Sequence, residues 1–433
     1  MSTQAAVAGD LRARPPHRSA SFSGAWLLSG AMVVSGVLTY AFHVLAARTL
    51  GPSAYGQIAV LWGAIFLGAI VLFRPIEQTT SRSIADRLAR GEEAAPVVRP
   101  ILALSATLMA VIAVAAALAW RPLTDHLFAG DNAMMAMLVG GTLAYGLSYV
   151  VRGLVGGVRW FRGYGLGLLS DSVGRLAVAA PLVFIASKSL AAFAVVVAGV
   201  VGALVPLYFG RRELAVLRAE GRGSGGFRTV SALSFAAPAS LMAGADQVLV
   251  NGAPLLVVLG TGHADKTVGV VFAATMLVRA PVYVFQGLAA SLLPNFTVLH
   301  AAERQRFLSV VHRAVVVLLA VGACIVVVSA VAGPAAMRML YGDAYSVSRG
   351  DLVLLGLGVA CYLGASTFSQ ALLALDCGSR AAAAWCASAV AFVVLYVVLP
   401  WSQLTRISLA FAVAMSGGLV LLWLLLTRHR PAG

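Results

Sequence analysis

Charged residues are scarce in this chain. Asp, Glu, Lys and Arg make up 11% of its 433 residues, whereas 60% are hydrophobic and the mean hydropathy is +0.92. Soluble domains carry about 25% charged residues, so the composition excludes a water-soluble globule and predicts a membrane protein. The net charge of +15 is spread between apolar runs rather than gathered in a block. This distribution argues against nucleic-acid binding and indicates a role in membrane orientation.

Cysteines and common site motifs are also sparse. The chain has four scattered cysteines, Cys324, Cys361, Cys377 and Cys386. They form neither a disulfide framework nor a metal cluster, and we interpret them as small core residues. The stretch GRGSGG at 221–226 lacks the spacing and the Lys of a phosphate-binding loop. We therefore expect no cofactor, no metal and no catalytic residue.

Apolar runs of about 20 residues, the length that crosses a bilayer, recur along the whole chain. A basic stretch without a small-residue cleavage site precedes the first run, so we expect this run to remain as an anchor. The sequence thus predicts an all-α polytopic membrane protein with 12 transmembrane helices. The predicted spans lie at approximately 25–47, 56–73, 101–119, 133–151, 168–187, 190–209, 232–258, 267–293, 314–333, 351–375, 382–400 and 408–427.

Basic residues alternate between the two sides of these runs. If the N-terminus and every second loop are cytoplasmic, 22 of the 31 basic residues lie on the cytoplasmic side and 7 on the other. Arg175 and Arg279 fall inside spans. Because cytoplasmic loops carry an excess of Lys and Arg, the pattern predicts that both termini are cytoplasmic and that the number of spans is even.

The chain is also doubled. LGPSAYG at 50–56, after the first span, has a counterpart in LGTGHADKTVG at 259–269, and LFAGD at 127–131 has one in MLYGD at 339–343. These and similar matches are shifted by 209 to 217 residues, and a common offset indicates an internal repeat. We therefore predict two parallel six-helix bundles. The predicted parts are a cytoplasmic tail at 1–24, an N-terminal bundle at 25–210, a cytoplasmic linker at 211–231, a C-terminal bundle at 232–427 and a cytoplasmic tail at 428–433.

Four stretches together resemble a known family. They are ARTLGPSAYGQIAVL (47–61), DQVLVNGAPLLVVLG (246–260), LLPNFTVLHAAERQRF (292–307) and MLYGDAYS (339–346). The chain is similar to the bacterial polysaccharide-subunit flippases of the multidrug/oligosaccharidyl-lipid/polysaccharide exporter superfamily. This resemblance covers nearly the whole chain. It implies two bundles packed as a V around a central cavity. It also implies movement of a polyprenyl-pyrophosphate-linked oligosaccharide from the inner to the outer leaflet of the bacterial cytoplasmic membrane by alternating access.

Other functions stay open at this point. Related multidrug members of the superfamily use a proton or sodium gradient, so a cation-coupled multidrug or metabolite antiporter of the same fold is the nearest alternative. A non-transporting membrane scaffold that recruits cell-wall enzymes is a third. A membrane-embedded polymerase or glycosyltransferase would need a sizeable outer loop, and the loops expected here reach only about 17 residues. Such enzymes are instead possible partners of a transporter.

Ionisable residues inside spans are costly and should face a cavity or a partner. Arg279 lies near the middle of the span 267–293, where Pro281 is expected to bend the helix. It either faces the cavity and meets the pyrophosphate of a lipid carrier, or forms a structural pair with an acid such as Asp246. His43 is expected near the outer end of the first span, and Arg48 at the membrane interface.

Further polar groups lie in the fifth and seventh spans. Asp246 begins a polar stretch that includes Asn251, and it either binds a coupling ion or neutralises a neighbouring Arg. Asp171 and Arg175 are four residues apart, the spacing of an intrahelical ion pair. We expect that pair to lower the cost of inserting the fifth span.

The stretch after the second span raises a separate question. Aligned by the repeat, RPIEQTTSR at 74–82 stands opposite the still apolar 287–295, which indicates that the second helix continues through a bend near Pro75. Residues 74–82 would then line the inner mouth of the cavity. The alternative is an amphipathic helix on the cytoplasmic surface. The residues expected to line the substrate cavity are Arg279, Arg74, Arg82, Glu77, Gln78, Gln286 and Asn251.

Overall fold

The computed structural model describes residues 18–218, 229–280, 282, 304–375 and 377–428. Every regular element in these ranges is a helix. Among them, eight helices are long and apolar enough to cross a membrane, or up to ten if each of two bent pairs counts as one span. The predicted all-α, multi-pass membrane fold is therefore confirmed. Gln286 and Pro281 lie outside the described residues.

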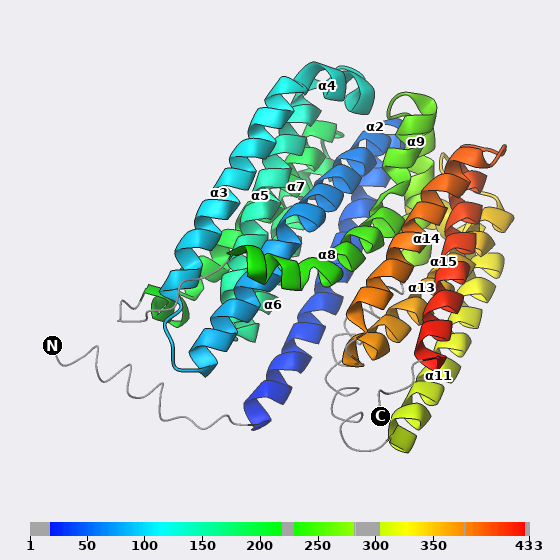
Figure 1. The fold of residues 1–433 in the computed structure, drawn as a ribbon. Coiled ribbons are helices and arrows are strands. Elements are labelled where there is room, and N and C mark those ends of the chain that lie inside the picture. Colours follow the sequence, from blue (N-terminus) through cyan, green and yellow to red (C-terminus); the bar gives the residue numbers. More distant parts are fainter. Residues whose placement is uncertain (1–17, 219–228, 281, 283–303, 376, 429–433) are drawn as a thin grey trace.

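The longest helix, α2 (Arg18–Ala89), consists of two antiparallel arms. Its 72 residues would extend about 108 Å if straight, more than three times the thickness of a bilayer core. The chain reverses at Gly51, whose φ of 72° and ψ of 169° are not helical. A positive φ suits glycine, and Pro52 starts the second arm at a position where its missing N–H costs nothing. Figure 1 shows both arms in blue.

The second arm continues through Pro75 to Ala89 without a break in the helix. The predicted continuation beyond Phe73 is therefore confirmed, and residues 74–82 are helical. Three glycines of α5, at 153, 156 and 157, lie against Glu77, Ser81 and Ile84. Because these glycines have no side chains, the arm can pack closely on α5 over this stretch.

Helices that follow α2 in sequence pack around it as a first group (Figure 1). The group comprises α3 (Ala95–Leu118), α4 (Trp120–Phe128), α5 (Asn132–Gly157), α6 (Phe161–Ala179), η1 (Ala180–Val183), α7 (Lys188–Phe209) and η2 (Glu213–Arg218). Asp131 and Ser187 cap the first turns of α5 and α7. The fifth predicted span, 168–187, was placed too late, because α6 already begins at Phe161.

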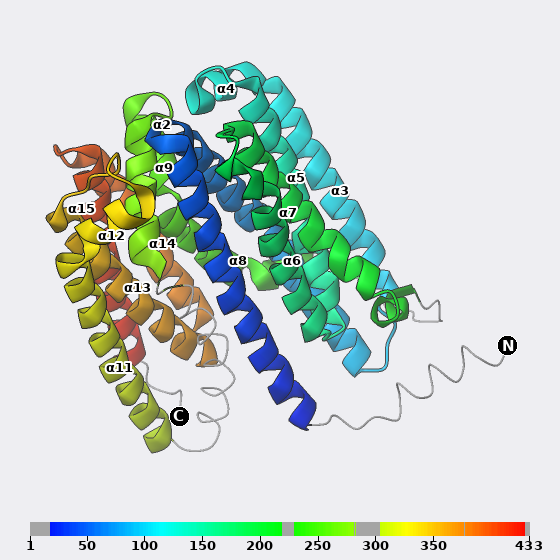
Figure 2. The ribbon, with the colours of Figure 1, turned by 180° about the vertical axis from the view of Figure 1, so that it is seen from behind.

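The remaining helices form a second group, which Figure 2 shows from behind. Two of its predicted spans are bent. The span 232–258 consists of α8 and α9, which meet at 60°, and α11 meets α12 at 70°. Each short helix has a proline in its first turn, which interrupts the helical hydrogen bonds at the bend. The group comprises α8 (Thr229–Asn251), α9 (Ala253–Thr261), a helix at 266–280, α11 (Arg304–Val331), α12 (Gly333–Tyr341), α13 (Arg349–Ala374), α14 (Gly378–Val398) and α15 (Gln403–Thr427).

The count of twelve spans stays a prediction. The two arms of α2 and the two bent pairs fit it, but the eighth span continues from 266–280 into residues outside the described ranges. The first arm of α2 begins, and α15 ends, at the same end of the molecule (Figure 1). That placement agrees with an even number of spans.

The two groups touch at the end of the molecule where α2 reverses, hereafter the Gly51 end. Further along the second arm of α2, α8 also packs against it, with Asn251 at Gly63 and Gly244 at Val71. A Cβ atom on Gly56 would clash with the carbonyl oxygen of Asp265, and one on Gly269 with that of Pro52. Gly56 and Gly269 are the residues that the internal repeat aligned. The two halves thus meet through equivalent positions, backbone against backbone.

Two side chains strengthen this contact. The Tyr345 hydroxyl donates to the carbonyl of Ala47 at 2.8 Å, and Arg48 Nη1 donates to the carbonyl of Met339 at 3.1 Å. Both bonds join the first arm of α2 to the second group. Together with the glycine pair they hold the Gly51 end closed.

Replacement of Gly56 by Val should force the Gly51 end apart, because the added side chain has no room beside Asp265. Spin labels on unnatural amino acids at the exposed positions 121 and 259, one in each group, should report longer distances. Gly417→Val is the matched control, since a Cβ there meets nothing within 4 Å. An unchanged distance distribution in Gly56→Val would contradict the role of the glycine pair.

Candidate functional site

Asp171 in α6 is the centre of a buried charged network in the first group. It pairs with Arg175 one turn later, which confirms the predicted intrahelical ion pair. Its Oδ1 also accepts a hydrogen bond from the Tyr145 hydroxyl at 3.1 Å, and Arg152 Nη2 lies 3.5 Å from Oδ2. Tyr145 and Arg152 belong to α5, so the carboxylate ties two helices together. We call these four residues the Asp171 network.

Arg175 is enclosed within this network. It donates to Thr39 Oγ1 at 3.0 Å and to the Tyr145 hydroxyl at 2.8 Å, and its guanidinium carbon lies 4.8 Å from the ring centroid of Trp62. The side chain is 2% exposed. The partners of the Arg175 cation lie on both arms of α2, on α5 and on α6. A charged side chain inside a membrane is costly unless such partners surround it. Arg175 therefore stabilises the packing of the first group.

Asp171→Asn should destabilise the protein strongly, because the Asp171 carboxylate faces both Arg175 and Arg152 and its loss leaves two buried cations without their counter-ion. Breaking a buried ion pair costs about 3–5 kcal/mol. Equilibrium unfolding in mixed detergent micelles measures the loss. The double variant Asp171→Asn/Arg152→Gln removes one of the two cations and should recover part of it. Equal unfolding free energies for the single and double variants would contradict this account.

Glu77 and Arg74 lie on the second arm of α2, on the side of the first group that approaches α8. Glu77 is 9% exposed, and its Oε1 accepts a 2.7 Å hydrogen bond from the Tyr164 hydroxyl of α6. Arg74 is half-buried and interacts electrostatically with Glu77, with Tyr164 and with Asp246 of the second group. Arg74 thus stands between the charges of the two groups.

Polar side chains of α8 form a chain of hydrogen bonds in the second group. Asp246 accepts from the Tyr362 hydroxyl at 2.7 Å and from Gln247 Nε2 at 2.9 Å. Asn251 Nδ2 in turn donates to Gln247 Oε1 at 2.6 Å, while its own Oδ1 is buried without a hydrogen-bond partner. The expected polar stretch is therefore one connected network, fixed to α13 by Tyr362.

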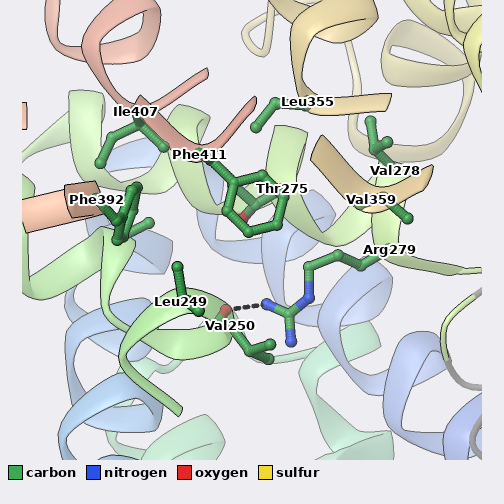
Figure 3. A pocket seen from close by; sticks show the side chains of 11 residues that line it. Leu249, Val250, Thr275, Val278, Arg279, Leu355, Val359, Phe392, Ile407 and Phe411 are labelled. Atoms are coloured by element: carbon green, nitrogen blue, oxygen red, sulfur yellow. Dashed lines mark hydrogen bonds between the residues drawn. The ribbon is translucent and has the colours of Figure 1, made fainter. Parts of the chain in front are cut away.

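Arg279 is buried, 8% exposed, and donates from Nη1 to the carbonyl of Val250 (Figure 3). That carbonyl lies four residues before Pro254 of α9, the position from which a continuous helix would supply an N–H. Arg279 therefore supplies the donor that Pro254 lacks. The described structure contains no ion pair between Arg279 and Asp246, so the alternative of a structural pair with that acid is not observed; the hydrogen bond of Arg279 goes to a backbone carbonyl instead.

The guanidinium borders a small pocket inside the second group (Figure 3). Its volume of ≈ 10 Å³ has room for about one water molecule. Apart from Arg279 and Thr275 the pocket is apolar; the other lining residues include Leu249, Val278, Leu355, Val359, Phe392, Ile407 and Phe411. A pocket of this size does not hold an oligosaccharide headgroup.

Arg279→Met should lower the free energy of unfolding by about 1.5–3 kcal/mol, the usual worth of a hydrogen bond from a charged donor. In a Pro254→Ala background the loss should be smaller, because an alanine at this position provides a backbone N–H for the Val250 carbonyl. A double-mutant cycle in detergent-mediated unfolding measures this coupling. If the two substitutions prove additive, Arg279 does not compensate for Pro254.

A larger pocket lies near the far end of the second arm of α2. Its volume is ≈ 400 Å³. We call it the Gln78 pocket, and its polar and aromatic lining consists of Glu77, Gln78, Ser81 and Arg82 of α2 with Arg159 and Phe161 at the junction of α5 and α6. Arg82 is largely exposed, and its Nε lies 3.7 Å from Oδ2 of Asp86, one turn later. Gln78 is 26 residues beyond Pro52, about 39 Å along the helix from the Gly51 end.

The candidate residues thus fall into separate places. Glu77, Gln78 and Arg82 share one pocket, and Arg74 lies beside it on the same arm. Asn251 and Asp246 belong to the α8 network, and Arg279 borders the small internal pocket. His43, expected near the outer end of the first span, lies eight residues before Gly51 and is fully buried, with the Tyr55 hydroxyl 3.2 Å from its Nδ1.

The residues that bind these charges were not predicted from the sequence. Arg152 was counted with a loop, which was wrong, because α5 extends to Gly157 and buries it beside Asp171. The spacing of Tyr145, Tyr149 and Arg152 in α5 places the three on one helix face, and that signal could have revealed them. Tyr164 and Tyr362 lie far in sequence from Glu77 and Asp246, and no local pattern joins them. The described residues contain no group of His, Cys, Asp and Glu that could hold a metal ion.

Comparisons with known proteins define the fold. No family model matches the chain. An uncharacterized protein of Mycobacterium bovis is 28% identical over 383 residues, with 85% of this chain and 84% of the relative covered. An uncharacterized protein of Mycobacterium tuberculosis is 27% identical over 390 residues, with 86% and 84% covered. These relatives match nearly the whole length of the chain.

Solved structures cover a larger share of this chain than these sequence relatives do. A multidrug resistance MATE family transporter of the MOP superfamily in an inward-facing conformation has a TM-score of 0.72 at 16% identity, covering 93% of this chain and 97% of that one. The outward-facing conformation gives 0.66, with 93% and 94% covered. A MATE transporter variant of Vibrio cholerae gives 0.61 at 14% identity, with 95% and 98% covered. The chain has the fold of the MATE transporters.

Proposed function

We propose that the protein is a membrane transporter that works by alternating access. The observation that carries this proposal is the closed Gly51 end, where two repeat-related groups touch through Gly56 and Gly269. Buried side chains also cross this contact, where Phe272 packs against His43 and Tyr55.

Further along α2, the half-buried charges of Arg74 and Asp246 interact across the two groups. The better match to an inward-facing than to an outward-facing MATE transporter supports the assignment of this conformation as inward-facing.

Cation-coupled antiport of a drug or metabolite is the mode that the solved neighbours favour, since they are described as multidrug transporters. In this mode Asp246 is the coupling residue. Its carboxylate is held by Tyr362 and Gln247 and interacts electrostatically with Arg74 across the two groups. Binding of a proton or cation at Asp246 would weaken that attraction and so favour a change of conformation.

A second candidate is flipping of a polyprenyl-pyrophosphate-linked oligosaccharide, and the charges favour it. Away from the first and last turns of the described helices, the buried and half-buried charged residues are Arg74, Arg152, Arg175 and Arg279 against Glu77, Asp171 and Asp246. Asp351 is buried in the first turn of α13. An excess of cations suits an anionic headgroup rather than a cationic drug. Arg74, Arg82 and Arg279 would attract the phosphates. A membrane potential that is negative inside would assist outward movement by about 2.3 kcal/mol per charge per 100 mV.

This second candidate implies the bacterial cytoplasmic membrane as the location, and a polysaccharide polymerase or glycosyltransferases as functional neighbours. Glu77, Gln78 and Asn251 would then meet sugar hydroxyls. The Gln78 pocket supports this assignment through its mixed lining of cationic, amide and aromatic groups. Arg279 would contribute chiefly through its charge, since its hydrogen bond to Val250 is structural.

Reconstitution into liposomes separates the two modes. One set of vesicles carries a fluorescent lipid-linked oligosaccharide, whose arrival in the outer leaflet is detected by a membrane-impermeant quencher. Another carries ethidium with an imposed proton or sodium gradient, and its export is followed by fluorescence. We expect the protein to accelerate one of the two over protein-free vesicles. No acceleration in either set would overturn the proposal and favour a non-transporting scaffold.

Asp246→Asn should abolish gradient-driven transport in the antiport mode, because an amide cannot take up the coupling proton. Asp351→Asn is a matched control, since Asp351 is also buried but only caps α13 through Ser348. Wild-type transport by Asp246→Asn under the gradient would exclude Asp246 as the coupling residue.

A further inference from the structure

We propose that the protonation state of His43 controls the Gly51 end: the neutral ring keeps the two groups together there, and the protonated ring lets them part. This inference rests on the proposed alternating access, because it names what releases the closed end. The proton would come from the water on the side of the membrane to which this end opens.

The ring of His43 belongs to an aromatic cluster that crosses from one group to the other. Its centroid lies 4.4 Å from that of Trp62, on the second arm of α2, and 5.2 Å from that of Phe272, in the second group. Tyr55 extends the cluster, with ring centroids 5.9 Å from Phe272 and 6.2 Å from Tyr345. None of these side chains is more than 5% exposed. A neutral imidazole therefore fills a closed, aromatic contact between the groups.

Only one of the two ring nitrogens of His43 has a hydrogen-bond partner in the described structure. Nδ1 lies 3.2 Å from the Tyr55 hydroxyl, whereas Nε2 is buried without a partner. A neutral ring can place its one hydrogen on Nδ1, toward the Tyr55 oxygen, and leave Nε2 without one. An imidazolium carries a hydrogen on both nitrogens, so its Nε2–H would be a charged donor buried without an acceptor. The closed contact thus accommodates the neutral ring and not the protonated one.

The charged groups that act on His43 oppose a positive charge on its ring. Arg175 of α6 and Arg279 of the second group both interact electrostatically with it. The guanidinium carbon of Arg175 also lies 4.8 Å from the ring centroid of Trp62 and 5.9 Å from that of Phe42. These two rings already hold a cation, so they offer little stabilisation to a second one.

The remaining titratable groups near the ring do not balance its charge. From the second arm of α2 the ring meets the Tyr55 hydroxyl, and beyond Tyr55 lies Tyr345 of the second group. Asp171 of α6 is held by Arg175. No carboxylate lies in ion-pair distance of His43 within the described ranges. Protonation would therefore place an uncompensated charge inside the closed contact.

Separation of the two groups at the Gly51 end would relieve this charge. Phe272 and Arg279 lie on one helix of the second group, so they would withdraw from His43 together and water would reach Nε2. A histidine in water has a pKa of about 6.5. Above this pH the ring is neutral in both states and the end stays closed; below it, protonation favours the open state. The ratio of open to closed protein should rise about tenfold from pH 8 to pH 5.5.

Distances between spin labels at positions 121 and 259, one in each group, test this switch. The purified full-length protein is placed in lipid nanodiscs, and the distance distribution is recorded at pH 8 and at pH 5.5. We expect the population with longer distances to grow at pH 5.5 by about tenfold relative to the closed one. An unchanged distribution in the wild type would overturn the inference.

Three variants of His43 separate its protonation from its packing. His43→Phe keeps an aromatic ring and His43→Asn keeps a polar group toward Tyr55, but neither takes up a proton, so each should give the same distances at both pH values. His43→Arg carries a permanent charge and should be open already at pH 8. His126→Asn, at an exposed histidine of α4, is the matched control and should respond to pH like the wild type.

Two further results would overturn the inference: a wild-type response to pH in His43→Phe and His43→Asn, or a closed Gly51 end in His43→Arg at pH 8. The liposome assay, run at the same two pH values, keeps this inference distinct from the proposed function. Opening at low pH without transport would retain the switch and remove the function. Transport with a Gly51 end that does not respond to pH would do the reverse.

Discussion

The cost of charge inside a membrane constrains the rest of this structure. Each ionisable side chain in the described spans must find a partner or line a polar space, and the partners it finds determine which helices pack together. Asp171 joins α5 to α6 through Tyr145 and Arg152, and Arg175 reaches back to Thr39 on α2. Charged side chains with partners in their own group hold that group together. Arg74 lies where the first group faces the second and interacts with Asp246 across the two groups.

Much of the fold could be predicted because it depends on local patterns. Apolar runs located the spans, the repeat located Gly56 and Gly269, and a four-residue spacing located the Asp171–Arg175 pair. The repeat also predicted that the second helix continues past Pro75, against its own polar sequence. These predictions succeed because helix length, helix faces and duplication are properties of neighbouring or aligned residues.

The candidate site was less accessible from the sequence. Tyr164 reaches Glu77 across 87 residues, and Tyr362 reaches Asp246 across 116, so neither pairing leaves a local trace. The position of Arg279 along its span placed it near the middle of the membrane, which predicted a cation that faces the cavity. Its hydrogen-bond partner is the Val250 carbonyl, which is free because Pro254, twenty-five residues before Arg279, has no N–H. Such partners are set by how helices pack, and packing is decided by the whole chain.

The contact between Gly56 and Gly269 has the symmetry of an interface between two equal subunits, because Gly56 meets the Asp265 carbonyl and Gly269 meets the Pro52 carbonyl. Two equivalent surfaces that touch through the same residues are what a two-fold symmetric dimer has at its axis. Away from this seam the two halves differ, since one contains the Asp171 network and the other an Arg279 that replaces a backbone donor.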